Sequence, residues 1–305
     1  MHRFVWLAGL VCLAMGCGMD GARPVAGDGQ CRRADPSVAA PPAHAEDNPA
    51  MAVNDRRLIG RLMNETSRLK EAGRTVKIAT LIEQLKTARC RLDLATPPKE
   101  VLSAEALYER AKESVVVVGG PYKCEKCGKI HMATASAFVI AAGACVTSYH
   151  VVDEPKKETL VVMTFDGRVL PVKGVLAASK ADDVAILQVE GLNSKPLALA
   201  PGAPVGSRVR VIGHPDGRFY ALTEGIVSRY LTLRRGEADV AMMAITADFA
   251  RGSSGAPVLN ECGAVVGIAA TTHSVYYDES GARENLQMVV KQCVPAASVL
   301  KLVQP

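Results

Sequence analysis

Aromatic side chains are scarce in this sequence: Phe, Trp and Tyr together make up 4% of its 305 residues. The core must therefore be built from small aliphatic residues, above all Ala and Val. The net charge of +5 is too small for this length to indicate a nucleic-acid-binding protein. No apolar run reaches the roughly 18 residues of a membrane-spanning helix. The sequence also lacks an HExxH motif, which would have indicated a metallohydrolase. The remaining composition, 49% hydrophobic and 22% charged, is that of a globular protein of about two domains.

The first 17 residues have the layout of a secretory signal. His2 and Arg3 precede an apolar stretch, residues 4–15, that is too short to span a bilayer. It ends in Leu13-Ala14-Met15-Gly16-Cys17, which is similar to a bacterial lipobox, with Leu one place further from the cysteine than usual. Three outcomes are open for this signal: lipidation of Cys17, ordinary signal cleavage, or an uncleaved anchor. Each predicts an extracytoplasmic protein, whether periplasmic, a cell-envelope lipoprotein or secreted. Lipid on Cys17 would attach the chain to a membrane.

Two segments separate this signal from the rest of the chain. Residues 18–51 are rich in Gly, Ala and Pro, which predicts a flexible linker. Residues 52–100 form a basic segment with apolar residues at helical spacing up to about Leu94, interrupted at Gly73. We interpret it as a small helical segment packed on its neighbour, with a partner-binding or membrane-surface role as the alternative. Ser103 then predicts the N-cap of a short helix that runs to Ala111.

Residues 101–305 form the predicted main domain, which is mainly β. From Ser114 onward, short Val-rich runs alternate with turn signals, among them Asp166-Gly167, which is typical of a hairpin. About a dozen strands at this spacing predict barrels or a sandwich, closed by a helix at about residues 295–302. The predicted strands cover residues 115–118, 135–140, 159–165, 168–176, 184–189, 208–212, 221–231, 240–247, 257–259, 264–270 and 286–290.

Three short motifs in this β-rich part combine the groups that acyl transfer needs. His150 ends a predicted strand, Asp183 enters another strand, and Ser254 lies in the glycine-flanked run 252–257. A serine hydroxyl needs an adjacent base, and a carboxylate keeps the imidazole in the right tautomer. The backbone N–H groups of Gly252 and Ser254 are candidates for an oxyanion hole. Asp182 is the rival for the acid, but Asp183 directly precedes its strand.

Together these motifs resemble the trypsin-fold serine proteases, most closely the HtrA/DegP-like branch. The branch has Thr-Asn-x-His-Val-Val, Asp-x-Ala-Leu-Leu and Gly-Asn-Ser-Gly-Gly-Pro where this chain has residues 147–152, 183–187 and 252–257. The resemblance covers about residues 107–302. It implies a double six-stranded β-barrel with the active site in the cleft between the barrels. We expect no PDZ domain, and the helical segment is additional to the family core.

Several residues depart from the family pattern. Ser148 replaces the usual Asn two places before the histidine, and Ala256 replaces the second glycine after the nucleophile. We expect Ala256 to be tolerated if its φ is negative. Ser253 stands where zymogens carry an aspartate, so activation by N-terminal insertion is not expected. Asp248 lies six residues before Ser254, the spacing of the acid at the base of the specificity pocket in trypsin; the alternative is an acid bound to loop amides.

Nine cysteines leave no complete pairing once the signal is set aside. Cys124 and Cys127, in a Cys-x-x-Cys-Gly turn followed by His131, predict a zinc-knuckle-like site, although a structural zinc site needs a fourth ligand. A disulfide in an oxidising compartment and free or redox-active thiols are the alternatives.

We therefore predict a serine endopeptidase that acts on polypeptides through His150, Asp183 and Ser254. Catalysis needs no cofactor in this interpretation, and zinc at the cysteine turn would be structural. The alternative is a non-catalytic, trypsin-fold binding module. The expected partner is a polypeptide substrate and not a nucleic acid, and the sequence does not indicate an oligomeric state.

Overall fold

The computed structural model describes residues 52–277 and 284–304. The predicted signal at residues 1–17, with Cys17, and the predicted linker at residues 18–51 lie outside these ranges and stay predictions. Within the described ranges, the helices are too short or too polar to cross a bilayer.

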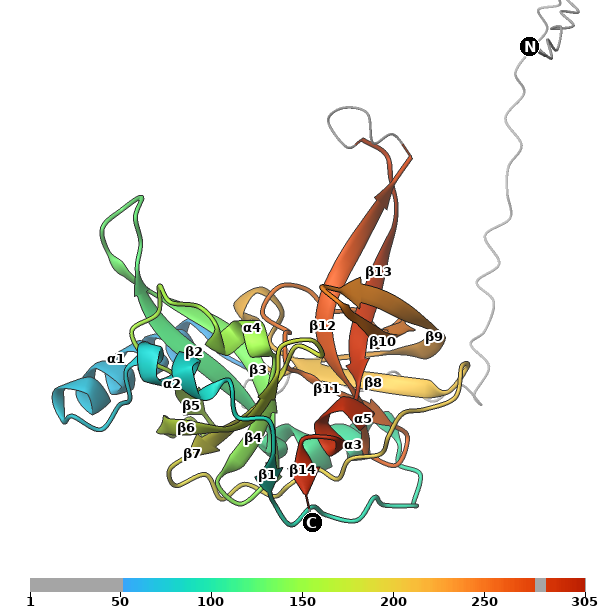
Figure 1. Ribbon diagram of the computed structural model, residues 1–305, viewed down its shortest axis with the longest axis horizontal. Coiled ribbons are helices and arrows are strands. Elements are labelled where there is room, and N and C mark those ends of the chain that lie inside the picture. The colour runs from blue at the N-terminus through green and yellow to red at the C-terminus, as the bar shows by residue number, and fades with distance from the viewer. Residues whose placement is uncertain (1–51, 278–283, 305) are drawn as a thin grey trace, which may run out of the picture. The chain divides into compact units, whose positions relative to one another are not determined.

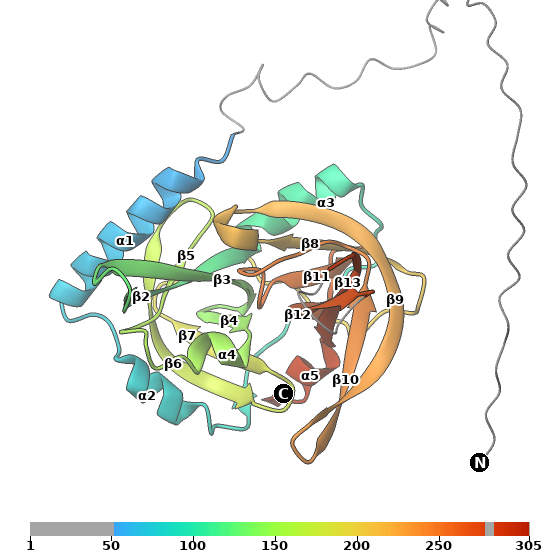
Figure 2. The ribbon, with the colours of Figure 1, turned by 90° about the horizontal axis from the view of Figure 1, so that it is seen from above.

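Twelve strands close into two antiparallel barrels. The arrangement of the barrels can be followed in Figures 1 and 2. The first barrel has the order β2-β3-β4-β7-β6-β5, and the second has the order β10-β13-β12-β11-β8-β9. This confirms the predicted double six-stranded barrel. The first six strands are β2 Val115–Lys123, β3 Ile130–Ala141, β4 Ala144–Thr147, β5 Val161–Met163, β6 Val169–Ser179 and β7 Val184–Val189. The second six are β8 Arg208–Gly213, β9 Ala221–Arg235, β10 Ala238–Ile245, β11 Pro257–Asn260, β12 Val265–Tyr276 and β13 Leu286–Pro295.

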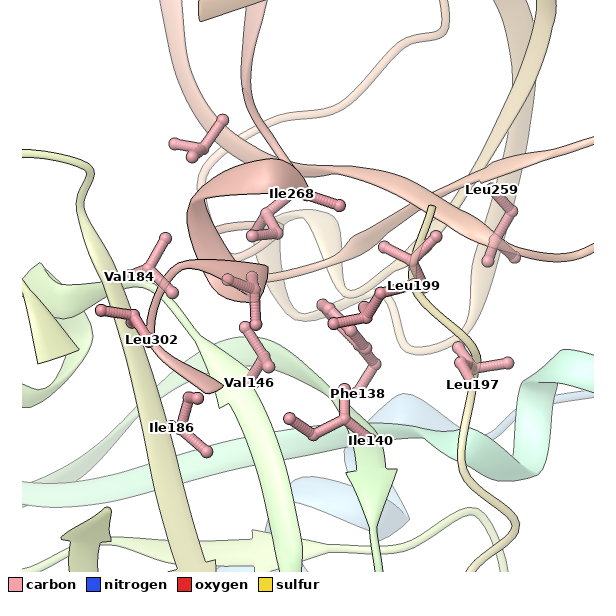
Figure 3. Close-up of a cluster of buried hydrophobic side chains, with 14 of the residues drawn as sticks. Phe138, Ile140, Val146, Val184, Ile186, Leu197, Leu199, Leu259, Ile268 and Leu302 are labelled. Carbon is pink, nitrogen blue, oxygen red and sulfur yellow. The ribbon is translucent and has the colours of Figure 1, made fainter. Parts of the chain in front are cut away.

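The continuous apolar runs arise because many strands are buried on both faces. Along β3, Ala137 and Val139 face the interior cluster of the first barrel, whereas Phe138 and Ile140 belong to a second cluster. That second cluster is shared with strands of the other barrel, including Ile268 of β12 (Figure 3). A strand buried on both faces removes apolar side chains from water inside its own barrel and also between the barrels. This burial stabilises each barrel and holds the two together.

The segment before the barrels contains two helices, α1 Asp55–Glu71 and α2 Ile78–Gln84, separated at Gly73, whose φ is +66°. Both lie on the outer side of the first barrel in Figure 2. Leu62 of α1 is fully buried in a cluster with Val117 and Met163 of that barrel. The helical segment and the two barrels accordingly form one compact unit from Ala52 onward.

The helical prediction is wrong beyond α2. Residues 90 and 91 form strand β1, Cys90–Arg91, which pairs in parallel with β14, Val303–Gln304, near the C-terminus. Because this pairing joins residues more than 200 positions apart, the local apolar spacing could not reveal it.

Short helices connect the remaining elements. α3, Ala104–Ala111, begins where predicted, since the Ser103 hydroxyl oxygen accepts a hydrogen bond from Ala106 N over 3.2 Å. The predicted last helix is shorter in the structure, where α5 covers Ala297–Leu300 because Pro295 still belongs to β13.

Candidate active site

His150 and Asp183 lie together at one end of the first barrel. His150 is in α4, Tyr149–Val152, a short helix that follows β4, and not at the end of a strand as predicted. Asp183 lies directly before β7, with a left-handed φ of +57°. Its carboxylate accepts from His150 N over 3.0 Å and lies 2.9 Å from His150 Nδ1. The carboxylate thus contacts both the backbone and the ring of His150, which orients the imidazole with Nε2 left for another partner.

The structure distinguishes the two candidate acids. The two carboxylate oxygens of Asp182 accept from the hydroxyls of Ser179 and Ser298, each over 2.8 Å. Its hydrogen-bonding capacity is used within the fold. Asp183 is therefore the carboxylate that His150 contacts, as its position before the strand predicted.

Ser254 lies in a tight turn of the second barrel, just before β11. Gly252 and Gly255 flank it with φ of +94° and +87°, which side chains rarely adopt. A Cβ at Gly252 would lie 2.5 Å from the carbonyl oxygen of His214, and one at Gly255 would lie 2.2 Å from that of Ser136. Both positions therefore require glycine, for backbone conformation and for close packing.

His150 and Ser254 line the same groove, which has a volume of about 620 Å³. Its other walls come from α1, from the β2–β3 hairpin, from residues 154–157 and from the turn at residues 216–217. Within the described part of the chain, the His150 ring is hydrogen-bonded to Asp183 and not to the Ser254 hydroxyl. Contacts between a nucleophile and its base are often long before substrate binds.

Two backbone donors beside Ser254 have no protein acceptor among the described residues. These are the N–H groups of Gly252 and Ser254, the pair predicted for an oxyanion hole. Between them, Ser253 N donates to Ala250 O over 3.0 Å, and after them Gly255 N donates to Ala269 O over 2.9 Å. The turn thus leaves alternate N–H groups available to a ligand in the groove.

One residue that the sequence analysis did not single out, Ser136 of β3, connects the two barrels at this turn. Its N–H donates to Ser254 O over 2.9 Å, and its hydroxyl donates to Gly252 O over 2.9 Å and accepts from His214 N over 3.1 Å. The side chain is fully buried. The only signal in the sequence is a single polar residue in the apolar run 135–141.

His214 lies beneath the same turn and is fully buried. Its Nδ1 accepts a hydrogen bond from Tyr220 N over 3.1 Å, while Nε2 has no partner among the described residues. Burial lowers the pKa of His214 to about 4, because a charged imidazole would lose its hydration there. His214 is therefore a neutral structural support for the turn at ordinary pH.

Comparison with known proteins agrees with this architecture. Residues 135–268 match the family model described as "Trypsin-like peptidase domain". The chain is 37% identical, over 161 residues, to a probable periplasmic serine endoprotease DegP-like of Halomonas elongata. It is 29% identical, over 187 residues, to the anti-sigma-I factor RsgI9 of Acetivibrio thermocellus. These alignments cover 51% and 58% of this chain, but only 32% and 25% of the relatives, so the chain spans about a third or less of them.

A solved structure supports the same fold. The active form of the Rv3671c protease of M. tuberculosis superimposes with a TM-score of 0.51 at 23% identity, covering 69% of this chain and 88% of that one. The two barrels have the trypsin-like fold. The family match begins within β3 and ends within β12, so it includes strands of both barrels.

The trypsin-fold domain accommodates the departures from the family pattern. Ala256 is fully buried and is not among the residues with positive φ, which meets the condition set for tolerating it. Its N–H donates to Ser253 O over 2.8 Å, so the turn keeps its hydrogen bond. Ser148 is buried, and its hydroxyl has no hydrogen-bond partner within the described ranges.

Asp248 is not at the base of an enclosed pocket. Its side chain is 78% exposed, and its carboxylate lies 2.6 Å from the ammonium nitrogen of Lys291. It does not line the groove that contains His150 and Ser254. The carboxylate thus contacts a lysine of β13, and the role of Asp248 in specificity stays a prediction.

Cys124, Cys127 and His131 come together at the tip of the β2–β3 hairpin. Their ligand atoms all lie within 4.8 Å of one another, as the spacing predicted. The backbone N–H groups of Cys127 and Lys126 lower the pKa of Cys124, since they stabilise its thiolate. Among the described residues no disulfide forms, and the six cysteines there are all free thiols.

Proposed function

We propose that this protein is a serine endopeptidase that cleaves polypeptides through His150, Asp183 and Ser254. The observation that carries the proposal is the carboxylate of Asp183 against His150 Nδ1, with His150 and Ser254 lining the same groove. The serine protease relatives support the class of reaction. Cleavage would need no group beyond the chain's own residues.

The groups present can perform each step of acyl transfer. Ser254 Oγ attacks the carbonyl carbon of the peptide bond while His150 Nε2 accepts its proton, and Asp183 stabilises the imidazolium that forms. The unused N–H groups of Gly252 and Ser254 donate to the oxyanion of the tetrahedral intermediate. His150 then protonates the leaving amine, and water hydrolyses the acyl-Ser254 ester with His150 again as base.

The second candidate is a non-catalytic trypsin-fold module that binds polypeptides. The observation that favours it is the missing hydrogen bond between Ser254 and His150 in the described chain, where the ring is bonded to Asp183 alone. A binding module would keep the groove and its lining without needing a nucleophile within reach of its base.

Digestion of an unfolded polypeptide such as reduced casein tests the proposal. We expect fragments from the wild-type chain and from Ser67→Ala, a control on the exposed face of α1, but none from Ser254→Ala or His150→Ala. Circular dichroism checks that each variant is folded. A folded wild-type chain that binds casein without cutting it would favour the binding module, and equal cleavage by Ser254→Ala would refute the catalytic assignment.

We also propose that the enzyme acts outside the cytoplasm. The support is the signal-like run at residues 4–15 and the description of the Halomonas relative as periplasmic. Cys17 is the proposed site of lipid attachment. Fractionation of cells that express wild type or Cys17→Ser tests both proposals. Wild type should be found in the membrane fraction and Cys17→Ser should not. A wild-type protein in the cytoplasm would contradict the proposed location.

A further inference from the structure

The tip of the β2–β3 hairpin is a preformed turn that gathers three strong metal ligands. It extends beyond the first barrel in Figure 1. Cys124 N donates to Lys129 O, and Gly128 N donates to Cys124 O, each over 2.8 Å. Gly128 has a φ of +68°, which closes the turn. Cys127 Sγ lies 3.1 Å from His131 Nε2. The backbone therefore holds the two sulfurs and the imidazole nitrogen together before any ligand arrives.

This donor set fits zinc. Two thiolates and an imidazole are ligands that Zn²⁺ prefers, with Zn–S of about 2.3 Å and Zn–N of about 2.0 Å. Around a tetrahedral ion of these bond lengths, neighbouring donor atoms lie roughly 3.5 Å apart. The observed upper limit of 4.8 Å leaves only small side-chain movements to complete the site.

We propose that Cys124, Cys127 and His131 bind one zinc ion. Within the described ranges, no further His, Cys, Asp or Glu belongs to this group. The neighbouring carboxylate of Glu125 lies 3.0 Å from the ammonium nitrogen of Lys156 instead. The fourth position is therefore open to water or to a donor atom from a bound partner.

The same hairpin forms a wall of the groove, so the metal has a structural consequence. Tyr122 of β2 and Met132 of β3 both line the groove, and Tyr122 pairs directly with His131 across the hairpin. The two rings lie 5.9 Å apart. Lys156, which pairs with Glu125 of the turn, lines the groove as well. A zinc ion that closes the turn therefore restricts the movement of this wall and supports substrate binding without joining the chemistry.

Metal analysis tests the site independently of any peptidase activity. The full chain is reduced, incubated with Zn²⁺, desalted and measured by mass spectrometry of the metal. We expect about one zinc per chain in the wild type and loss of that zinc in Cys124→Ser, Cys127→Ser and His131→Gln. Cys262→Ser and His273→Gln are matched controls from the second barrel and should keep it.

Two further readouts complete the test. Co²⁺ in place of zinc should give the visible absorption of a tetrahedral thiolate site, which is lost in the cysteine variants. Amide exchange in residues 122–132 should slow when zinc is added. Reduced wild type without zinc, zinc retained by the ligand variants, or a Cys124–Cys127 disulfide in the chain isolated without reductant would overturn the proposal. None of these outcomes depends on whether Ser254 is a nucleophile.

Discussion

The two barrels contribute different kinds of groups to one groove. The first supplies the imidazole and the carboxylate, His150 and Asp183, next to well-buried strands. The second supplies Ser254 on a turn whose conformation depends on glycine. Neither barrel alone therefore contains a complete site. Ser136, a residue of the first barrel bonded to the turn of the second, joins the two halves.

The largest effect is expected from the acid of the first barrel. Asp183→Asn should lower kcat of polypeptide cleavage by about 10⁴-fold, because an amide no longer selects the tautomer with Nε2 free to accept the serine proton. The neighbouring Asp182→Asn is the matched control and should keep kcat, since that side chain contacts Ser179 and Ser298. Steady-state kinetics on both variants would reverse the assignment of the acid if Asp182→Asn proved to be the inactive one.

A second effect concerns α1, which packs on the first barrel and accepts a hydrogen bond from Phe219 N, in the segment between β8 and β9, through Asp55. Leu62→Ala should lower the free energy of unfolding by about 2–5 kcal/mol, because Leu62 is fully buried among strands of that barrel and leaves a cavity. Urea denaturation measures it, with the exposed Leu286→Ala of β13 as control. An unchanged midpoint for Leu62→Ala would mean that the helical segment is not part of the folded unit.

The third effect is a pH dependence beneath the turn of the second barrel. The pKa of His214 is about 4 in the folded protein, below the ordinary value of 6.5, so the unfolded chain binds the proton more tightly. The contribution of neutral His214 to the free energy of unfolding is therefore fully present above pH 6.5. It is lost as the pH drops from 6.5 toward 4, by up to about 3 kcal/mol. Urea unfolding at pH 7 and pH 4.5 should show a smaller difference in His214→Asn than in wild type. An equal pH dependence of the unfolding free energy in wild type and His214→Asn would contradict the lowered pKa of His214.

The smallest effect is expected at the joint between the barrels. Ser136→Ala should cost about 1–3 kcal/mol of stability, because it leaves Gly252 O and His214 N without a partner. It should also lower kcat by roughly tenfold, since one oxyanion donor belongs to Gly252. Ser114→Ala removes another buried hydroxyl, bonded to Lys195 O, and should lower stability with kcat kept. Equal kcat in the two variants would remove Ser136 from the catalytic account.

Much of the fold could be predicted because the strands are buried on both faces and stand out as short apolar runs. The capped helix at Ser103 and the hairpin at Asp166-Gly167, where Gly167 has a φ of +81°, depend on local chemistry and were found for that reason. The outer halves of β2 and β3 were missed, since Gly119, Gly120 and Pro121 are typical of turns and Lys123 and His131 are polar. The helix α4 was missed because it has only four residues.

The candidate site divides in the same way. The chosen acid, Asp183, could be located by its place before a strand. The roles of Ser136 and His214 could not be found, because the bond from Ser136 to Gly252 O joins residues 116 positions apart. The sequence also could not show that Asp248 is exposed and paired with Lys291, since that contact crosses from the loop to β13.

Labelling with a fluorophosphonate probe, followed by mass-spectrometric mapping of the modified residue, tests the central claim most directly. The probe forms a covalent bond only with a serine that its base activates. We expect a single modification on Ser254, lost in His150→Ala and strongly slowed in Asp183→Asn. A folded wild-type chain that takes up no probe, or one modified at a serine outside the groove, would contradict it.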